Sequence, residues 1–299
     1  MDINASNMSV IDIAYSKLFK DAFASADVAY EDYTTTIRLN ATKIGLPWLE
    51  KFAGMREWIG DRQVKSLASK KLEYTERSFE DTVAVPRRDV ETNTWGEYST
   101  LIQQMGQAAG NQKGLLASEA LTTNDTWAID DKLFYAVDHA YGNYTINNYT
   151  TNALSETSFN VAYKLMSSYQ DHQGNPLLST PNVLRVGPAL RVTAWNILKN
   201  KFAYNSTDKV QIENVNKDLV DLVIDKTLVG TKANYWFLQS TKGVIKPVIQ
   251  NIPKKVVLTQ LTKNTDANVF SSDEFLYGTN MYATTGKTFP HLCYGGFKS

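Results

Sequence analysis

Apolar residues recur every three or four positions in two stretches of the chain, which is the spacing of an amphipathic helix. The first stretch lies within residues 10–35, and the second begins at Tyr98. In the second, Gly106, Gly110 and Gly114 recur every four residues. In one continuous helix these glycines form a bare stripe that permits close approach of another backbone, or a bend. Alternatively, one helix ends near Gly110 and another begins after Gly114, because each glycine costs about 1 kcal/mol in a helix interior.

Short apolar runs in the second half of the chain predict strands. In PNVLRVGPALRVTAWNILKNK, residues 181–201, Gly187 interrupts a β-branched run, and Pro188 suits the first turn of a following helix. Strand followed by helix implies that helices cover part of a sheet. Strands are predicted at residues 183–186, 219–224, 234–239, 243–250 and 255–261.

Two further regions have less regular patterns. Residues 124–182 mix Asn, Thr, Tyr and Gly, which predicts irregular structure around a short helix near residues 159–169. After Val269, the pairs Tyr277-Gly278 and Thr285-Gly286 resemble turn signals. We therefore expect the C-terminal residues to form a closing sheet edge.

The stretch KKLEYTERSFEDTVAVPRRDV, residues 70–90, alternates in the manner of two strands of a hairpin with a charged exterior. Pro86 cannot donate a ladder hydrogen bond, so the second arm lies at an edge or ends there. Arms of about 9 residues at ~3.3 Å each extend about 30 Å. Because a compact chain of this length has a radius of gyration of roughly 19 Å, a projecting hairpin would reach past its own body. The alternative is a surface hairpin that folds back on its own domain.

A dense mixture of charges surrounds a tryptophan in MREWIGDRQV, residues 55–64. Charged residues are usually solvated surface, whereas aromatic residues dominate the energetics of interfaces, so Trp58 is the predicted anchor of a contact. Charges beside it and along the hairpin could set the register of that contact by ion pairs, whereas most of them are expected to be simply solvated. The candidate interface residues are Trp58, Arg56, Arg62, Lys70, Arg77, Arg87, Arg88 and Asp89.

Composition limits the classes of partner. The chain has 299 residues, with 31 Lys plus Arg against 31 Asp plus Glu, so it lacks the basic excess of a dedicated nucleic-acid binder. Zero net charge also lets many copies lie close together. Its single cysteine, Cys293, excludes an intrachain disulfide framework. No signal-peptide pattern and no apolar run of membrane-spanning length occurs, so we expect no membrane partner.

Candidate chemistry is sparse. His291 and Cys293 are two residues apart, which on one strand would place them on the same face as base and nucleophile, although a small buried cysteine beside an incidental histidine is the commoner arrangement. A hard cation could be held by Asp130, Asp131, Asp138 and His139, although these match no loop template. No phosphate-binding, nucleophile-elbow, zinc-protease or dinucleotide motif occurs. We therefore expect no catalytic, cofactor or metal site.

Four motifs along nearly the whole chain carry a family resemblance. They are WL with MREW-x-G-x-R in 48–62, the run FEDTVAVPRRDVETNTWGEY in 79–98, the strand and helix of 181–190, and VF followed by YG in 269–278. In this order the sequence resembles the Mu-type phage major head subunit family, often called gpT. Residues 124–180 depart most from the family pattern.

The resemblance implies an α+β chain with the Hong Kong 97 phage capsid fold. It implies a major capsid protein, not an enzyme, that forms pentamers and hexamers of an icosahedral shell around double-stranded DNA, which it contacts non-specifically. Further expected partners are a separate scaffold, a portal and decoration proteins. The expected location is the virion, with assembly in the host cytoplasm. The implied parts are an N-terminal arm at 1–59, an extended hairpin loop at 60–92, the spine helix and peripheral domain at 93–180, the axial domain at 181–255 and a return to the peripheral domain at 256–299.

Two other functions stay open at this point. A tail tube protein would also be a self-assembling virion part with repeated contacts. A cysteine-dependent hydrolase would use Cys293 as its nucleophile.

Overall fold

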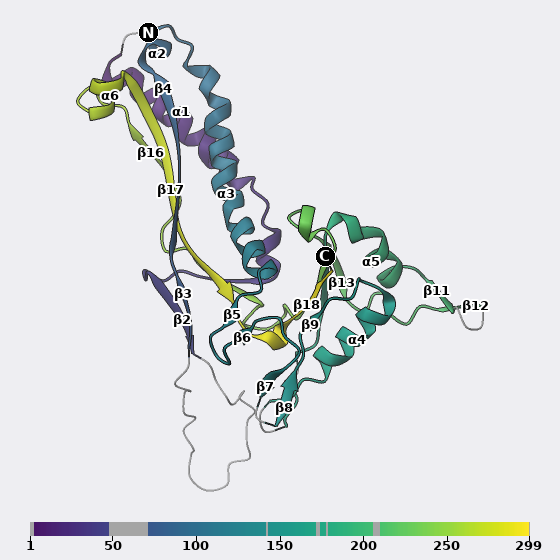
Figure 1. Ribbon diagram of the computed structural model, residues 1–299. Coiled ribbons are helices and arrows are strands. Elements are labelled where there is room, and N and C mark those ends of the chain that lie inside the picture. The colour runs from purple at the N-terminus through teal and green to yellow at the C-terminus, as the bar shows by residue number, and fades with distance from the viewer. Residues whose placement is uncertain are drawn as a thin grey trace.

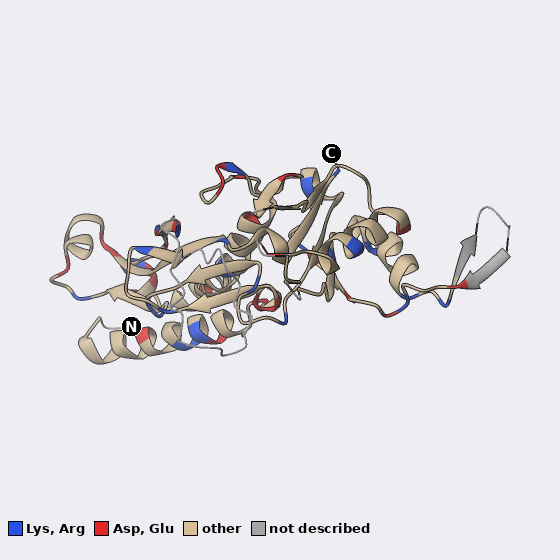
Figure 2. Ribbon diagram, turned by 90° about the horizontal axis from the view of Figure 1, so that it is seen from below, with Lys and Arg blue, Asp and Glu red and all other residues tan. Residues whose placement is uncertain are grey.

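A long arm and a second lobe set at an angle to it make up the molecule (Figure 1). The structure is a computed structural model that describes residues 3–47, 71–141, 143–171, 174–177, 179–205 and 210–298. Helices and strands both contribute to each part, so the predicted α+β class is confirmed. Lys and Arg are interspersed with Asp and Glu along both parts (Figure 2), as expected from the zero net charge.

Two helices run side by side along the arm. Helix α1 spans Ala5–Ala24 and buries Met8, Ile11, Tyr15 and Phe19. The helix predicted within 10–35 therefore begins and ends earlier than expected. Its N-terminus is capped by the side chain of Asn4, which accepts from the backbone N–H of Asn7 at 2.9 Å.

Helix α3 spans Ser99–Thr122 without interruption, so of the two alternatives the single continuous helix is confirmed and the break between Gly110 and Gly114 is excluded. The glycine stripe instead lets α1 approach α3 closely. A Cβ added at Gly106 would lie 2.5 Å from the carbonyl oxygen of Phe19, and one at Gly110 would lie 2.4 Å from the Cβ of Ala26. These separations are too short for any side chain, and they show why glycine occupies both positions.

One five-stranded sheet forms the long axis of the arm, in the order β1-β15-β17-β16, with β4 on the other side of β17. All ten residues of β4 pair antiparallel with β17, from Arg77 opposite Ala283 to Pro86 opposite Glu274. Val85, Phe275 and Met281 join the helices α1 and α3 in one buried cluster. The strands are β1 (Thr34–Ile37), β4 (Arg77–Pro86), β15 (Val248–Asn251), β16 (Leu258–Leu261) and β17 (Glu274–Lys287).

The predicted hairpin within residues 70–90 has the wrong strand pairing. Strand β3 (Lys71–Thr75) pairs antiparallel with β2 (Lys43–Pro47), and only Glu76 separates β3 from β4. Strand β4 belongs to the sheet of the arm, so residues 77–92 of the predicted 60–92 loop are part of the subunit's own body. We call the pair β2 and β3 the β2–β3 ribbon. It lies toward the end of the arm that is opposite α2 (Arg87–Glu91) and α6 (Ala267–Ser272) (Figure 1).

The second lobe contains the other five-stranded sheet, in the order β13-β10-β14-β18-β9. Its strands from residues 183 to 239 agree with the prediction, and so does the helix after Pro188. Near the chain's end, however, the predicted sheet edge is wrong. Strand β17 lies inside the arm's sheet and β18 lies between β14 and β9. The elements are β9 (Tyr149–Thr150), α4 (Glu156–Ser167), β10 (Val183–Val186), α5 (Arg191–Leu198), β13 (Asp221–Ile224), β14 (Tyr235–Gln239) and β18 (Cys293–Phe297).

Short paired strands complete the described structure. They are β5 (Thr126–Trp127) with β6 (Lys132–Leu133), β7 (His139–Tyr141) with β8 (Tyr144–Ile146), and β11 (Phe202–Asn205) with β12 (Val210–Glu213). Thus the region 124–182 has the irregular character that its composition predicts, with α4 at the expected place. Among the helices in the described ranges, none combines the length and apolar character needed to cross a membrane.

A buried arginine joins the two parts of the molecule. Arg185 on β10 is 1% exposed, and its Nη1 donates to Asp225 at 3.2 Å while its Nε donates to Gln239 at 3.1 Å. Its guanidinium lies over the ring of Tyr33, 4.2 Å from the centroid. Because Tyr33 directly precedes β1, this one side chain connects the sheet of the second lobe with the arm.

Candidate subunit interface

The predicted contact residues fall into two groups. Arg56, Trp58, Arg62 and Lys70 lie outside the residues that the structure describes, and their role stays a prediction. Arg77, Arg87, Arg88 and Asp89 are described. The structure places Arg77 near the β2–β3 ribbon and the other three at the opposite end of the arm, on α2 (Figure 1).

Arg77 bonds within its own subunit. Its Nη1 donates to both carboxylate oxygens of Glu119 at 3.0 Å, which fastens the start of β4 to the last turns of α3. The guanidinium also lies 5.2 Å from the ring centroid of Phe79. Since both partners of the ion pair are about half exposed, the pair contributes at most about 1 kcal/mol. The main effect of this ion pair is therefore to fix the position of α3 relative to β4.

The charged side chains on α2 differ in whether they already bond to other residues of the same subunit. Arg87 Nε donates to Glu91 at 3.1 Å and lies 3.8 Å from Asp273, while Asp89 accepts from the hydroxyl of Tyr98 at 2.5 Å. Arg88 is exposed, and its guanidinium makes no ion pair or hydrogen bond among the described residues. Of the described candidates, Arg88 is thus the one most available to another molecule.

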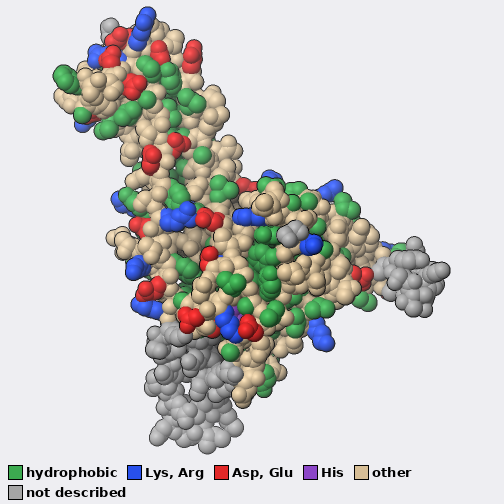
Figure 3. Space-filling model, viewed as in Figure 1, with side chains coloured by type: hydrophobic (Ala, Val, Ile, Leu, Met, Phe, Trp, Pro, Cys, Tyr) green, Lys and Arg blue, Asp and Glu red, His purple; other side chains and the backbone are tan. Residues whose placement is uncertain are grey.

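Exposed apolar side chains at the arm's outer end were not among the predicted contacts. Phe270 on α6 is 92% exposed, and apolar side chains gather over this end of the arm in Figure 3. Gathered apolar side chains are typical of an interaction surface, and an aromatic residue among them makes Phe270 a candidate contact. The sequence signal was the pair Val269-Phe270 in a short helix, of which only Val269 is buried. Other exposed apolar residues of the arm are Val10, Ile13, Leu101 and Leu261.

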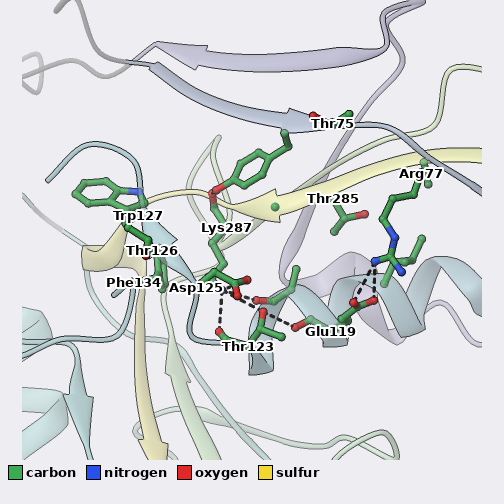
Figure 4. Close-up of a pocket in the computed structure, with 15 residues that line it drawn as sticks. Thr75, Arg77, Glu119, Thr123, Asp125, Thr126, Trp127, Phe134, Thr285 and Lys287 are labelled. Carbon is green, nitrogen blue, oxygen red and sulfur yellow. Dashed lines mark hydrogen bonds and ion pairs between the residues drawn. The ribbon is translucent and has the colours of Figure 1, made fainter. Parts of the chain in front are cut away.

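A cavity of about 260 Å³ lies where the β2–β3 ribbon, the C-terminal end of α3 and the end of β17 meet (Figure 4). Lys287 is its central charged group, with a side chain only 7% exposed. Its Nζ donates to the carbonyl oxygens of Thr123 at 2.7 Å and Ala120 at 3.2 Å, and lies 3.7 Å from Asp125. Burial lowers the pKa of Lys287 to about 8, and Asp125 partly opposes that shift. At neutral pH the ammonium therefore persists and caps the carbonyl end of α3.

The candidate nucleophile has an unfavourable environment. Cys293 is 1% exposed, and burial raises the pKa of its thiol to about 12. Burial also lowers the pKa of His291 to about 3, and the imidazole stacks on Phe289. His291 lies in a short 3₁₀ helix, Pro290–Leu292, so the two residues do not share the strand that the nucleophile arrangement would require. A thiol that stays protonated beside a very weak base is poorly suited to nucleophilic catalysis.

Chemical modification should show this protection. We expect a thiol reagent at pH 8 to modify Cys293 in the folded protein about 100-fold more slowly than in denaturant, because the thiolate and the reagent's access are both suppressed. The rate of modification can be followed by mass spectrometry. Equal rates in the folded and denatured protein would contradict the buried position.

The acidic residues considered above as cation ligands bond to other residues of the protein. His139 Nδ1 lies 2.6 Å from Asp130, and its Nε2 lies 2.8 Å from the carbonyl oxygen of Phe134. Asp138 accepts from Lys132 Nζ at 2.6 Å. Across the described ranges, no group of three or more His, Cys, Asp or Glu side chains is arranged to hold a metal ion. These contacts are those of a structural hydrogen-bond network.

The sequence matches the family described as Mu-like prophage major head subunit gpT over residues 8–158, 141–228 and 224–298. The chain belongs to this family. A curated relative, the Mu-like prophage FluMu major head subunit of Haemophilus influenzae, is 23% identical over 278 residues, which cover 93% of this chain and 68% of the relative. The family resemblance inferred from the sequence motifs is thereby confirmed, and it favours a head subunit over a tail tube protein.

Solved capsid structures share the fold of this head subunit. The subunit from the procapsid of bacteriophage JBD30 matches with a TM-score of 0.60 at 23% identity, covering 99% of this chain and 77% of that one. A subunit of the JBD30 capsid decorated with minor capsid protein trimers matches with a TM-score of 0.58 at 23% identity, covering 71% of this chain and 94% of that one. The predicted Hong Kong 97 phage capsid fold is confirmed, and the chain is a phage major capsid protein.

Proposed function

We propose that this head subunit assembles with copies of itself into an icosahedral shell, through pentamers and hexamers, that encloses double-stranded DNA. The observation that carries the proposal is the separation of possible contacts along an elongated arm. Arg88 and Phe270 lie at one end, and the β2–β3 ribbon lies toward the other (Figure 1). A subunit with distinct contact surfaces forms heterologous interfaces, which close when the rotation between copies permits.

The assembly mechanism adds moderate contacts over many copies. In the proposal, the β2–β3 ribbon lies against an adjacent subunit, and Arg56, Trp58 and Arg62, which fall between its two strands in the sequence, contact that subunit. The proposed contact element thus begins at the described strands β2 and β3, whose pairing starts upstream of the 60–92 expected from the sequence. A standard interface buries about 1,600 Å² in total. Because each copy makes several such contacts, modest pairwise affinities still give a durable shell.

The other domains of the subunit are proposed from the way the Hong Kong 97 fold is expected to divide the chain. Residues 93–180 would supply the spine helix and peripheral domain, and 181–255 the axial domain at the centre of each pentamer or hexamer. Within the expected return at 256–299, β17 joins the arm whereas β18 pairs with β14, so the last residues would belong to the axial sheet. The proposed N-terminal arm, residues 1–59, would include α1, which packs on its own α3.

Other partners are proposed from the same function. A separate scaffold and a portal would direct assembly in the host cytoplasm. The packaged DNA would be touched non-specifically, and only weakly because the chain has no basic excess. Decoration proteins are a further candidate, since one solved relative carries minor capsid protein trimers. We propose no catalytic activity for this chain. Cys293→Ala should therefore leave assembly unchanged. Loss of a hydrolytic activity in that variant would instead favour the alternative, a cysteine-dependent hydrolase.

Charge reversal on α2 distinguishes contact from folding. Arg88→Glu should leave the unassembled subunit within about 0.5 kcal/mol of its original stability, because no described partner is lost, yet lower the yield of particles several-fold. Arg87→Glu is the matched variant, and it should also destabilise the subunit by up to about 1 kcal/mol through loss of its own ion pairs. Thermal melts and particle counts by electron microscopy measure both effects. Normal particle yield from Arg88→Glu would reject a contact at this position.

The decisive experiment for the function is negative-stain microscopy of the purified chain, alone and with a scaffold protein. Closed polyhedral shells are the expected product. Tubes of uniform width would support the tail tube alternative. A monomer under every condition, scaffold included, would overturn the proposal.

A further inference from the structure

The aromatic ring of Tyr74 on β3 lies directly on the backbone of Gly286 in β17. A Cβ added at Gly286 would lie 2.3 Å from Cε2 and Cζ of that ring, and 2.4 Å from Cδ2. No side chain can occupy such a space, so residue 286 must be glycine for Tyr74 to lie where it does. Residues far apart in the sequence thus form one tightly fitted contact at the base of the β2–β3 ribbon.

Hydrogen bonding fixes the orientation of the tyrosine in this contact. Its hydroxyl donates to the carbonyl oxygen of Lys287 at 2.5 Å. Burial raises the pKa of Tyr74, which keeps the hydroxyl a donor. Leu72, two residues earlier on the same face of β3, is 1% exposed. The ribbon is therefore held on its own subunit at its base by Leu72 and Tyr74.

Lys287, the last residue of β17, also holds the end of α3. The backbone carbonyl of Lys287 accepts from Tyr74, and its side-chain ammonium donates to the carbonyls of Ala120 and Thr123 (Figure 4). Arg77 provides a second connection, from the first residue of β4 to Glu119 on α3. Ribbon, sheet and helix consequently meet in one bonded group. We call Tyr74, Gly286 and Lys287 the hairpin joint.

The chain geometry makes this joint the pivot of the ribbon. Strand β4 is held in register with β17 over all ten of its residues, so it cannot rotate independently of the arm. Only Glu76 separates β4 from β3. The direction in which the ribbon leaves the arm therefore depends on how β3 is held just beyond that residue, which is at Tyr74.

We propose that the hairpin joint sets the direction of the β2–β3 ribbon and so positions it for a second copy of this chain, an inference that rests on the proposed shell function. Lys287 connects this direction to the C-terminal end of α3. The residues of the joint orient the ribbon, and it is the ribbon that contacts the second copy. A change at the joint should therefore alter which assemblies form while the subunit still folds.

Glycine-to-alanine variants at two positions of β17 provide the main test. In Gly286→Ala the new methyl displaces the Tyr74 ring, and we expect the yield of closed particles of normal diameter to fall at least about tenfold, with open or irregular assemblies instead. Gly278→Ala is the matched control, because its Cβ would come closest to the rotatable hydroxyl of Thr82 at 3.2 Å and to the carbonyl oxygen of Asp81 at an ordinary 3.6 Å, and normal particles are expected. Circular dichroism of unassembled subunits should be unchanged in both.

Variants of Tyr74 keep the test decisive if Gly286→Ala fails to fold. Tyr74→Phe retains the ring on Gly286 and should give particles of normal diameter, whereas Tyr74→Leu removes both ring and hydroxyl and should give irregular ones. Hydrogen exchange in the unassembled Tyr74→Leu subunit should rise in β3 and stay unchanged in β14. Normal particles from a folded Gly286→Ala, or from Tyr74→Leu, would overturn the proposal. Failure of the unaltered chain to assemble would instead count against the proposed function.

Discussion

Replacing Gly110 by leucine is expected to lower the free energy of unfolding by about 3 kcal/mol, because the side chain has no space between α3 and α1. Even the first atom of the new side chain would lie 2.4 Å from the Cβ of Ala26 and 2.9 Å from the carbonyl oxygen of Phe23. Helix α1 would have to move off α3 and expose Phe19 and its neighbours in the buried cluster. Denaturant melts of the unassembled subunit measure the loss.

Alanine at two positions of the same helix supplies the control. Gly110→Ala meets the same short distances, whereas the Cβ of Gly114→Ala would lie 3.5 Å from Tyr30, which is ordinary contact. Gly114→Ala should be neutral or stabilise the subunit by up to about 1 kcal/mol, since alanine is the better helix former. Equal effects at the two positions would contradict the close approach of α1 at Gly110.

Arg185→Met is expected to destabilise the subunit by about 3–5 kcal/mol, the cost of leaving one partner of a buried ion pair without the other. The substitution removes the bonds to Asp225 and Gln239 and the stacking on Tyr33. Because these groups belong to different parts of the molecule, thermal unfolding should also become less cooperative. Differential scanning calorimetry measures both properties.

An exposed ion pair provides the comparison for Arg185. Lys199 Nζ lies 2.6 Å from Asp218, but the two side chains are 32% and 57% exposed. Lys199→Met should therefore cost no more than about 1 kcal/mol. A loss in Arg185→Met that is as small as in Lys199→Met would show that the buried arginine does not hold the two parts together.

Local pattern predicted elements well and their partners poorly. The period and length of the apolar runs located α3, α4 and α5 and the strands β10, β13 and β14, because these patterns are local to each element whatever it packs against. By contrast, β3 and β4 alternate like a hairpin, yet the partner of β4 is β17, almost two hundred residues later. Alternation reports that a strand has two different faces and carries no information about its neighbour.

Glycine was misread for the same reason. Gly278 and Gly286 resembled turn residues, whereas both lie inside β17. At Gly286 the requirement comes from the ring of Tyr74, which only the folded chain brings there. The stripe in α3 was read more successfully, because its spacing is local even though α1, which fills it, is not.

The interface could be predicted in kind but not residue by residue. Charge balance and the family motifs indicated contact between copies, but they could not distinguish Arg87, bound within its own subunit, from the free guanidinium of Arg88 in the described part of the chain. The exposure of Phe270 depends on which face of a one-turn helix is buried, and such a short segment has too few residues to define a period.

The central claim is that each subunit is completed by another copy through the β2–β3 ribbon. A cryo-electron microscopy map of assembled particles, at a resolution that shows side chains, tests it most directly. The account predicts a closed shell in which the β2–β3 ribbon of every subunit contacts an adjacent subunit. A shell in which the ribbon contacts only its own subunit would contradict it.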